Sequence, residues 1–364
     1  MIEPDDRIER LLRSEVRALS AYHVPDSKGY IKLDAMENPY HWPSETVELW
    51  LNRLRGAEPN RYPDPACVGL KTALKNANGV PAQAELLLGN GSDEIIQILL
   101  MALKSGATVL APEPTFVMYR QISQSLGLRF IGVPLRGDDF SLDAELFCAA
   151  IETHQPAIIF LAYPNNPTGN LFGKESMERI LAIAPGVVVV DEAYAPYADA
   201  SFMSQLEKHG NLLVMRTLSK LGLAGLRLGF LAGHPRWIGE LDKVRLPYNI
   251  NVLTQVSAEV ALEQHAVFDA QVNHILHERA LLKAALDQMT EVRTYDTRAN
   301  FILVRLLRHD ASEVFLALRK AGILVKNLHP SGGLLSQCLR ITVGTPDENL
   351  KFLEAFRQAV KTPI

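Results

Sequence analysis

Short apolar runs that alternate with helical patterns dominate the chain from about residue 80 to residue 235. The runs ELLLG, TVLAPEP, AIIFLAYP, VVVVDEAY and LLVMRTL have the length of strands, and segments such as SDEIIQILLMALKSG between them have helical spacing. Strands that are apolar on both faces are typical of a mostly parallel sheet covered by helices. The sequence therefore predicts an α/β domain, in which ligands gather beyond the carboxyl ends of the strands.

The pattern changes after Tyr248, which indicates a second domain. A long helical stretch is followed by shorter strands and helices, such as ANFILVRL, SEVFLALRKAG and CLRITVG. A chain of 364 residues is long enough for a large and a small domain. We expect an N-terminal arm over residues 1–40 that contributes to the small domain or to a dimer, a large domain over 41–250, and a small α+β domain over 251–364.

The composition of the chain argues against several classes of protein. A formal net charge of −4 argues against a broad grip on nucleic acid or anionic lipid. The 3 cysteines are scattered and form no CxxC pair, so neither a disulfide framework nor a zinc ribbon is indicated. The acidic N-terminus resembles no targeting peptide, and the apolar runs fall far short of the roughly 20 residues of a membrane helix. We expect a cytoplasmic protein.

Lys220 is the first candidate for chemistry. It follows an apolar strand, in TLSKLGLAGLRLGF, where almost no other polar group surrounds it. An isolated lysine is more often a solvated surface residue. Burial disfavours the ammonium form, however, and would make this amine a usable nucleophile toward an aldehyde.

Asp191 is the second candidate, because it ends the run VVVVD and would lie at the carboxyl edge of a central strand. A carboxylate in that position often only caps a loop. Beside a lysine-bound pyridine ring, it would keep the ring nitrogen protonated, and the protonated ring can stabilise a carbanion at a substrate α-carbon. Lys220 and Asp191 together therefore predict a site for pyridoxal 5'-phosphate.

Further polar residues follow the same strands and suit the other edges of that cofactor. Asn166 in YPNNPTGN and Tyr194 in DEAY could both donate to its phenolate oxygen, although Asn-Pro turns alone are common loop punctuation.

The cofactor phosphate needs donors, and GNGSDEIIQILL has a glycine-rich loop that runs into a helix N-terminus. Gly91, Ser92 and Asp93 are the expected donors, although a plain N-cap would look the same. Thr217 and Arg227, on either side of the lysine, could complete the phosphate site, for which the planar fork of arginine is well suited.

Taken together, these motifs resemble the fold-type-I pyridoxal phosphate aminotransferases, and within that fold type the histidinol-phosphate aminotransferases. The similarity covers almost the whole chain, through LSAY, LDAMENPY, NRYPDP, GNGSDEIIQIL, PTFVMY, YPNNPTG, VVVVDEAY, RTLSKLGLAGLRLGF and CLRITVGT in that order. It implies a large domain with a mostly parallel seven-stranded sheet between helices, and a smaller α+β domain. It also implies transamination of L-histidinol phosphate with 2-oxoglutarate, to imidazole acetol phosphate and L-glutamate, as in histidine biosynthesis.

The resemblance implies roles for individual residues. Lys220, Asp191 and Tyr194 would be the catalytic residues, with Lys220 as the Schiff-base lysine. The resemblance further implies a homodimer in which Tyr62 reaches across the interface to the neighbouring subunit's cofactor phosphate, a cofactor ring stacked on Phe116, and substrate contacts from Tyr22, Asn38 and Arg340.

Two features depart from the pattern of the family. The stacking position, most often tyrosine in the family, is Phe116, which keeps the aromatic face and lacks the hydroxyl. The segment from Lys220 to Arg227 is one residue shorter than in the commonest form of the motif. Arg227 therefore needs a compensating loop conformation to reach the phosphate.

Other functions fit parts of the sequence. An aromatic amino-acid aminotransferase, or a decarboxylase similar to threonine-phosphate decarboxylase, would need the same lysine and aspartate. A non-enzymatic effector-binding module would be expected to carry an added basic DNA-binding segment, which the sequence lacks. A nucleotide site is disfavoured because GNGSDE fits neither GxGxxG nor GxxxxGKS. No metal is expected, since His274 and His277 are followed by Glu278 and Arg279, as on a solvated helix face.

Overall fold

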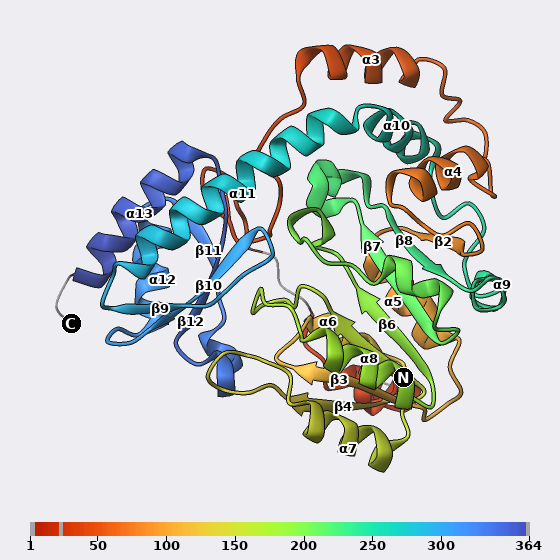
Figure 1. The fold of residues 1–364 in the computed structure, drawn as a ribbon, viewed down its shortest axis with the longest axis horizontal. Coiled ribbons are helices and arrows are strands. Elements are labelled where there is room, and N and C mark those ends of the chain that lie inside the picture. Colours follow the sequence, from red (N-terminus) through yellow and green to blue (C-terminus); the bar gives the residue numbers. More distant parts are fainter. Residues whose placement is uncertain (1–3, 22–24, 362–364) are drawn as a thin grey trace.

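A computed structural model describes residues 4–21 and 25–361, which form two sheets with their covering helices (Figure 1). The larger sheet has 7 strands in the order β2-β8-β7-β6-β5-β3-β4. Its strands are β2 (Glu85–Gly89), β3 (Thr108–Glu113), β4 (Arg129–Pro134), β5 (Ile158–Ala162), β6 (Val187–Asp191), β7 (Leu212–Thr217) and β8 (Gly229–Gly233).

The central strands of this sheet are parallel, as the sequence predicted. β3 pairs in parallel with β4 and β5, and β5-β6 and β6-β7 are parallel too. Only β8 runs the other way, pairing antiparallel with β7 and β2. Every residue of β5 and β6 is buried, which explains why these strands are apolar on both faces.

Two apolar layers cover the opposite faces of the large sheet. Along β5, Ile158 and Phe160 pack into one layer and Ile159 and Leu161 into the other, as the two-residue period of a strand requires. The first layer includes buried residues of α5 (Ser92–Met101), α6 (Val117–Ser125) and α9 (Pro235–Asp242). The second includes buried residues of α4 (Val68–Ala77), α7 (Ala144–His154) and α8 (Lys174–Ile183).

The smaller sheet has 5 strands in the order β1-β11-β12-β10-β9. They are β1 (Ile31–Leu33), β9 (Val292–Thr294), β10 (Phe301–Leu306), β11 (Ile323–Asn327) and β12 (Cys338–Thr342). β1 comes from the N-terminal segment and pairs in parallel with β11, so the first part of the chain completes the C-terminal sheet. Helices α12 (Ala311–Lys320) and α13 (Pro346–Lys361) pack with this sheet.

The long helix α11 (His265–Asp287) connects the two parts, as Figure 1 shows. It contacts α13 and β9 of the smaller part, and also the turn that carries Lys220. The helix before it, α10 (Val252–Glu263), contacts α3 (Ser44–Leu54) and α4 on the larger part. The domain boundaries at 40/41 and 250/251 stay predictions.

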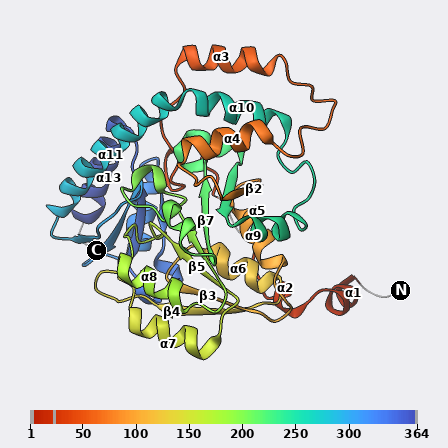
Figure 2. The same ribbon diagram turned by 45° about the vertical axis from the view of Figure 1, so that its right-hand side comes forward.

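Helices α1 (Pro4–Leu11) and α2 (Ser14–Arg17) precede the rest of the fold, and α1 extends away from the body in Figure 2. Arg13 donates to the backbone oxygen of Ser125 at the end of α6. Within residues 4–21 and 25–361, no helix is long and apolar enough to cross a membrane.

Candidate active site

One cavity lies at the carboxyl ends of the central strands and collects most of the residues that the sequence singled out. Asp191 ends β6, Thr217 ends β7, and Lys220 follows β7 directly. The cavity is lined by Met36, Ser92, Asp93, Phe116, Ala162, Pro164, Asn166, Asp191, Ala193, Tyr194, Thr217, Ser219, Lys220 and Arg227.

Lys220 lies in a π-helical turn, Ser219–Leu223, that contains Gly222 with a φ of 126°. L residues rarely adopt this φ, so glycine permits the turn. The Nζ atom of Lys220 donates to the backbone oxygen of Ala35 at 3.0 Å. Burial, followed by the nearby charge of Arg340, lowers the pKa of Lys220 to about 8. Part of the amine is therefore neutral near pH 7 and can act as a nucleophile or base.

Asp191 is held by two donors at the bottom of the cavity. The hydroxyl of Tyr119 donates to Oδ2 at 2.5 Å, and the backbone N–H of Ala193 donates to Oδ1 at 3.1 Å. Burial raises the pKa of Asp191 to about 6, and these two hydrogen bonds oppose the rise. A cation placed against this carboxylate would favour its charged form.

The N-terminus of α5 forms the end of the cavity that is suited to an anion. Gly91, which precedes the first residue of α5, has a φ of 84° and packs so closely that a Cβ there would lie 2.6 Å from Nη2 of Arg227. The Arg227 guanidinium also donates to Ser219 Oγ and Asp93 Oδ2, both at 3.4 Å. The carboxylate of Asp93 thus pairs with Arg227, and the donor that Asp93 could offer to an anion is its backbone N–H in the first turn of α5.

The shortened segment between Lys220 and Arg227 keeps the guanidinium at the cavity. A short 3-10 helix, Ala224–Leu226, follows the π-helical turn, and Arg227 then adopts a left-handed backbone conformation with a φ of 52°. This is the compensating conformation that the sequence pattern required. Thr217, which was expected near the same anion, donates to Ser219 Oγ at 3.0 Å.

Asn166 and Tyr194 line the same cavity as Lys220 and Asp191. Asn166 Oδ1 accepts a hydrogen bond from Arg340 Nη1 at 2.5 Å. Tyr194 is buried and packs edge-on against Phe301, with ring centroids 5.1 Å apart. Burial raises the pKa of its hydroxyl, so this residue stays a neutral donor at physiological pH.

The expected substrate contacts come from the smaller part of the fold and the N-terminal segment. Arg340 lies on β12, is buried, and donates to the backbone oxygen of Asp34 at 2.9 Å. The Asn38 amide donates at 2.9 Å both to Leu221 O and to Gln271, so it supports the lysine turn and does not line the cavity. Tyr22 lies outside the residues that the structure describes.

Tyr62 is placed differently from the other predicted residues. Its side chain is 80% exposed and stacks on Tyr248, with ring centroids 4.4 Å apart and planes 19° from parallel. It is not among the residues that line the cavity of its own chain.

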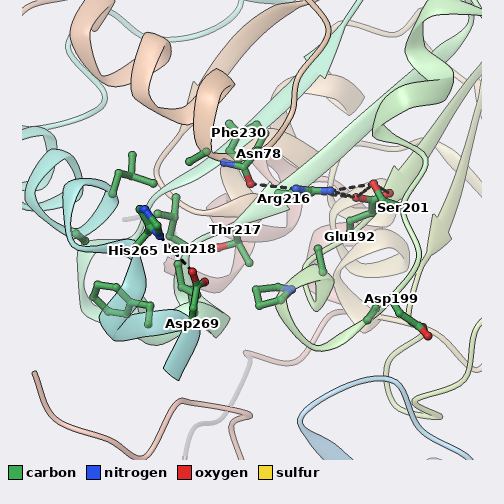
Figure 3. A pocket seen from close by; sticks show the side chains of 18 of the residues that line it. Asn78, Glu192, Asp199, Ser201, Arg216, Thr217, Leu218, Phe230, His265 and Asp269 are labelled. Carbon is green, nitrogen blue, oxygen red and sulfur yellow. Dashed lines mark hydrogen bonds and ion pairs between the residues drawn. The ribbon is translucent and has the colours of Figure 1, made fainter. Parts of the chain in front are cut away.

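Two features of the site were missed by the sequence reasoning, and one is Tyr119. The other is a buried ion pair in a second pocket, which shares the lining residue Thr217 with the cavity and is shown in Figure 3. Arg216 donates twice to Glu192 Oε2, at 2.9 and 2.7 Å, and the Glu192 side chain is fully buried. Because these residues neighbour Asp191 and Thr217, the pair ties the ends of β6 and β7 together. The sequence did carry a signal for this pair, because Glu192 and Arg216 are charged residues at the ends of otherwise apolar strands.

No group of three or more His, Cys, Asp or Glu side chains suited to a metal occurs in the described part of the chain. The cavity instead combines a low-pKa amine, a buried carboxylate, an aromatic face and an anion-binding helix end. Such a set can bind a ring that carries an aldehyde, a basic nitrogen and a phosphate, and can move a proton beside it.

Comparisons with known proteins agree with this chemistry. The family described as aminotransferase class I and II matches residues 28–356. Histidinol-phosphate aminotransferase 2 of Nitrosococcus oceani is 54% identical over 357 residues, which covers 98% of this chain and 99% of the relative. Histidinol-phosphate aminotransferase 1 of Ralstonia nicotianae is 52% identical, covering 98% of this chain and 96% of the relative.

A solved structure has the same fold. It is the histidinol-phosphate aminotransferase of Sinorhizobium meliloti in complex with pyridoxal-5'-phosphate, and it matches with a TM-score of 0.82 at 24% identity. The match covers 96% of this chain and 98% of that one.

Proposed function

Because the chain belongs to the class I and II aminotransferases, we propose that it transfers the amino group of L-histidinol phosphate to 2-oxoglutarate with pyridoxal 5'-phosphate as cofactor. The products are imidazole acetol phosphate and L-glutamate. One observation carries the proposal: Lys220 and Asp191 line a single cavity at the ends of neighbouring strands. An amine and a carboxylate so placed can meet opposite edges of one ring.

The residues that line the cavity fit this cofactor. Lys220 would hold its aldehyde, and Asp191 would accept from its protonated ring nitrogen. The N-terminus of α5 and Arg227 would bind its phosphate, and the close approach of Arg227 to Gly91 supports that assignment. When bound, pyridoxal phosphate supplies a protonated ring that accepts the electron pair left behind when the substrate α-carbon loses its proton.

Proton transfer falls to the Lys220 amine. With cofactor and substrate bound, Lys220 Nζ would be the group that accepts the α-proton of the substrate and later gives it up again. A pKa of about 8 keeps both the neutral and the charged form accessible near pH 7, which suits a group that acts first as base and then as acid. Asn166 and Tyr194, which line the same cavity, would orient the ring by donating to its phenolate oxygen.

Arg340 would bind the anionic end of the substrate. A guanidinium fork fits the phosphate of histidinol phosphate as well as a carboxylate of glutamate, so one residue can serve both half-reactions. The names of the relatives favour histidinol phosphate over aromatic amino acids as the donor. Contacts from Tyr22 and Asn38 stay predictions.

We propose, in addition, that the active form is a homodimer and that Tyr62 completes the partner's phosphate site. The exposure of Tyr62 supports this, as do three exposed apolar residues of neighbouring segments, Val68, Leu246 and Leu253. An apolar surface of this kind is typical of a protein interface. The cytoplasmic location also stays a prediction.

Single-turnover spectroscopy of the cofactor-loaded protein tests the proposed reaction. Histidinol phosphate should abolish the visible absorption of the lysine-bound cofactor in one exponential phase, and 2-oxoglutarate should restore it. Lys220→Ala, loaded with cofactor, is the matched control and should show no such cycle.

Three results would each contradict part of the proposal. Faster loss of absorption with phenylalanine would identify an aromatic aminotransferase. Release of carbon dioxide from an amino-acid phosphate would identify a decarboxylase. No spectral response to any amino donor would remove the proposed function altogether.

A further inference from the structure

Tyr119 lies beneath the cavity and contacts the one carboxylate on which the proposed chemistry depends. It belongs to α6, its side chain is completely buried, and its hydroxyl donates to Asp191 Oδ2 at 2.5 Å. A phenol that donates to a carboxylate makes a charge-assisted hydrogen bond, which is roughly twice as strong as a neutral one. Tyr119 therefore interacts with the charged form of Asp191 more strongly than with the neutral form.

The orientation of the phenol ring is determined by two aromatic neighbours. Phe160 on β5 stacks on it at 4.6 Å between centroids, with planes 8° from parallel. Phe116, the expected stacking residue for the cofactor, meets it edge-on at 5.6 Å and 85°. Tyr119 thus supports both the aromatic face of the cavity and the carboxylate at its edge, and the hydroxyl has little freedom to leave Asp191.

The charges around Asp191 make its protonation sensitive to the hydrogen bond from Tyr119. Burial and the negative charges of Asp93 and Glu192 all favour the neutral form of Asp191, whereas the hydrogen bonds from Tyr119 and the Ala193 N–H oppose them. The balance leaves the pKa of Asp191 at about 6. Loss of one of the two donors would move that pKa upward, toward the pH at which the enzyme works.

The hydroxyl of Tyr119 itself remains a donor. Burial, with the charge of Asp191 and the nearby Tyr194 and Asp93, raises the pKa of Tyr119 well above its ordinary value. The proton therefore stays on the phenol, and the negative charge stays on the carboxylate.

We propose that Tyr119 is a positioning residue for the ring-nitrogen contact: its hydroxyl holds Asp191 ionised and aimed into the cavity, ready for a protonated pyridine. This inference rests on the proposed function, because it concerns the same cofactor site. It assigns Tyr119 no direct contact with substrate or cofactor.

Pyridoxine phosphate is a suitable probe, since it has the ring nitrogen and the phosphate and lacks the aldehyde that would bond to Lys220. Its dissociation constant should be measured by calorimetry with the cofactor-free protein over a range of pH. For the unaltered protein, affinity should fall only as the pH drops below about 6, where Asp191 takes up a proton. In Tyr119→Phe this fall should begin at a higher pH, and affinity at pH 7 should be about tenfold lower, because a hydrogen bond to a charged group has been lost.

A double-mutant cycle separates this role from simple packing. In an Asp191→Asn background, Tyr119→Phe should change affinity by less than about twofold, because no charge is left to stabilise. Tyr295→Phe, which removes another buried phenol that accepts from Arg305 outside the cavity, is the matched control and should leave the pH profile unchanged. An equal loss of affinity in both backgrounds, or an unshifted pH profile in Tyr119→Phe, would overturn the proposal.

A second variant keeps the test decisive should Tyr119→Phe fail to fold. Fluorotyrosine introduced at position 119 retains the shape and makes the phenol a stronger donor, so the fall in affinity should move to lower pH. A shift in the opposite direction would count against the inference. If the unaltered protein binds neither pyridoxine phosphate nor pyridoxal phosphate, the proposed function fails as well, whereas normal binding with an inert Tyr119 removes only the present inference.

Discussion

Replacing Lys220 with methionine should stabilise the cofactor-free protein near neutral pH. In the folded protein the pKa of Lys220 falls from 10.5 to about 8, mainly because burial disfavours the charged amine. At pH 7 the amine is mostly charged in the folded state and fully charged in the unfolded state, and the folded state bears the cost of the buried charge. At about 1.4 kcal/mol per unit of pKa, and less because the Lys220 side chain is partly exposed, the cost is about 2–3 kcal/mol.

The pH dependence of this effect has a definite sign. Between pH 8 and 10.5 the folded protein has already released the Lys220 proton and the unfolded chain has not, so the stability of the wild-type protein rises with pH. The advantage of Lys220→Met should therefore be complete below about pH 8 and disappear by about 10.5. Any constant part of the difference reflects the packing of the methionine side chain.

Urea unfolding of the two cofactor-free proteins, followed by fluorescence at pH values across this window, measures the difference in free energy of unfolding. Lys208→Met replaces an exposed lysine and is the matched control, with no expected change in that difference across the window. A gap between wild type and Lys220→Met that stays constant with pH would refute the reasoning. So would a variant that is less stable than the wild type at pH 7.

Three further predictions follow from the same contacts. Arg216→Met should lower the free energy of unfolding by about 3 kcal/mol, because the buried Glu192 carboxylate loses its cationic partner and keeps only the hydrogen bonds from Ser201 and Phe202. A loss below about 1 kcal/mol in urea unfolding would contradict this. Gly91→Ala should weaken binding of pyridoxal phosphate at least about tenfold in equilibrium dialysis. The new methyl group would displace Arg227, and the φ of 84° is strained for alanine. Unchanged affinity would count against the phosphate assignment. Mixing the inactive variants Tyr62→Ala and Lys220→Ala in equal amounts should restore about a quarter of wild-type activity. Random exchange makes about half of the dimers mixed, and each mixed dimer has one intact shared site out of two. No recovery after confirmed exchange would argue against a contribution across the interface.

The large sheet and the position of the site could be read from local patterns. The strands β5 and β6 are buried at every residue and apolar at every residue except Asp191, which ends β6, as expected of strands covered on both faces. In a parallel sheet the carboxyl ends of such strands lie at one edge. Asp191 and Thr217 were therefore expected at the same edge, and the pairing of β6 with β7 brings them, and Lys220 after them, close together.

Other features of the site depend on partners that are distant in the sequence. The contact between Tyr119 and Asp191 spans 72 positions and is set by how α6 lies against β5 and β6. The Asn38 amide reaches Leu221 and Gln271, which are 183 and 233 positions away, and so it supports the lysine turn from outside the cavity. No periodicity or motif encodes these distances.

The sequence by itself determined the class of fold, the gathering of polar groups at one edge of the sheet and the chemical types of those groups, because these follow from short-range periodicity and from the hydrophobic effect. Tertiary structure alone decided how those groups are tuned. The pKa of Asp191 and that of Lys220 arise from burial and from neighbours on other elements, and the strength of an electrostatic interaction depends on distances and local polarity that exist only once the chain has packed.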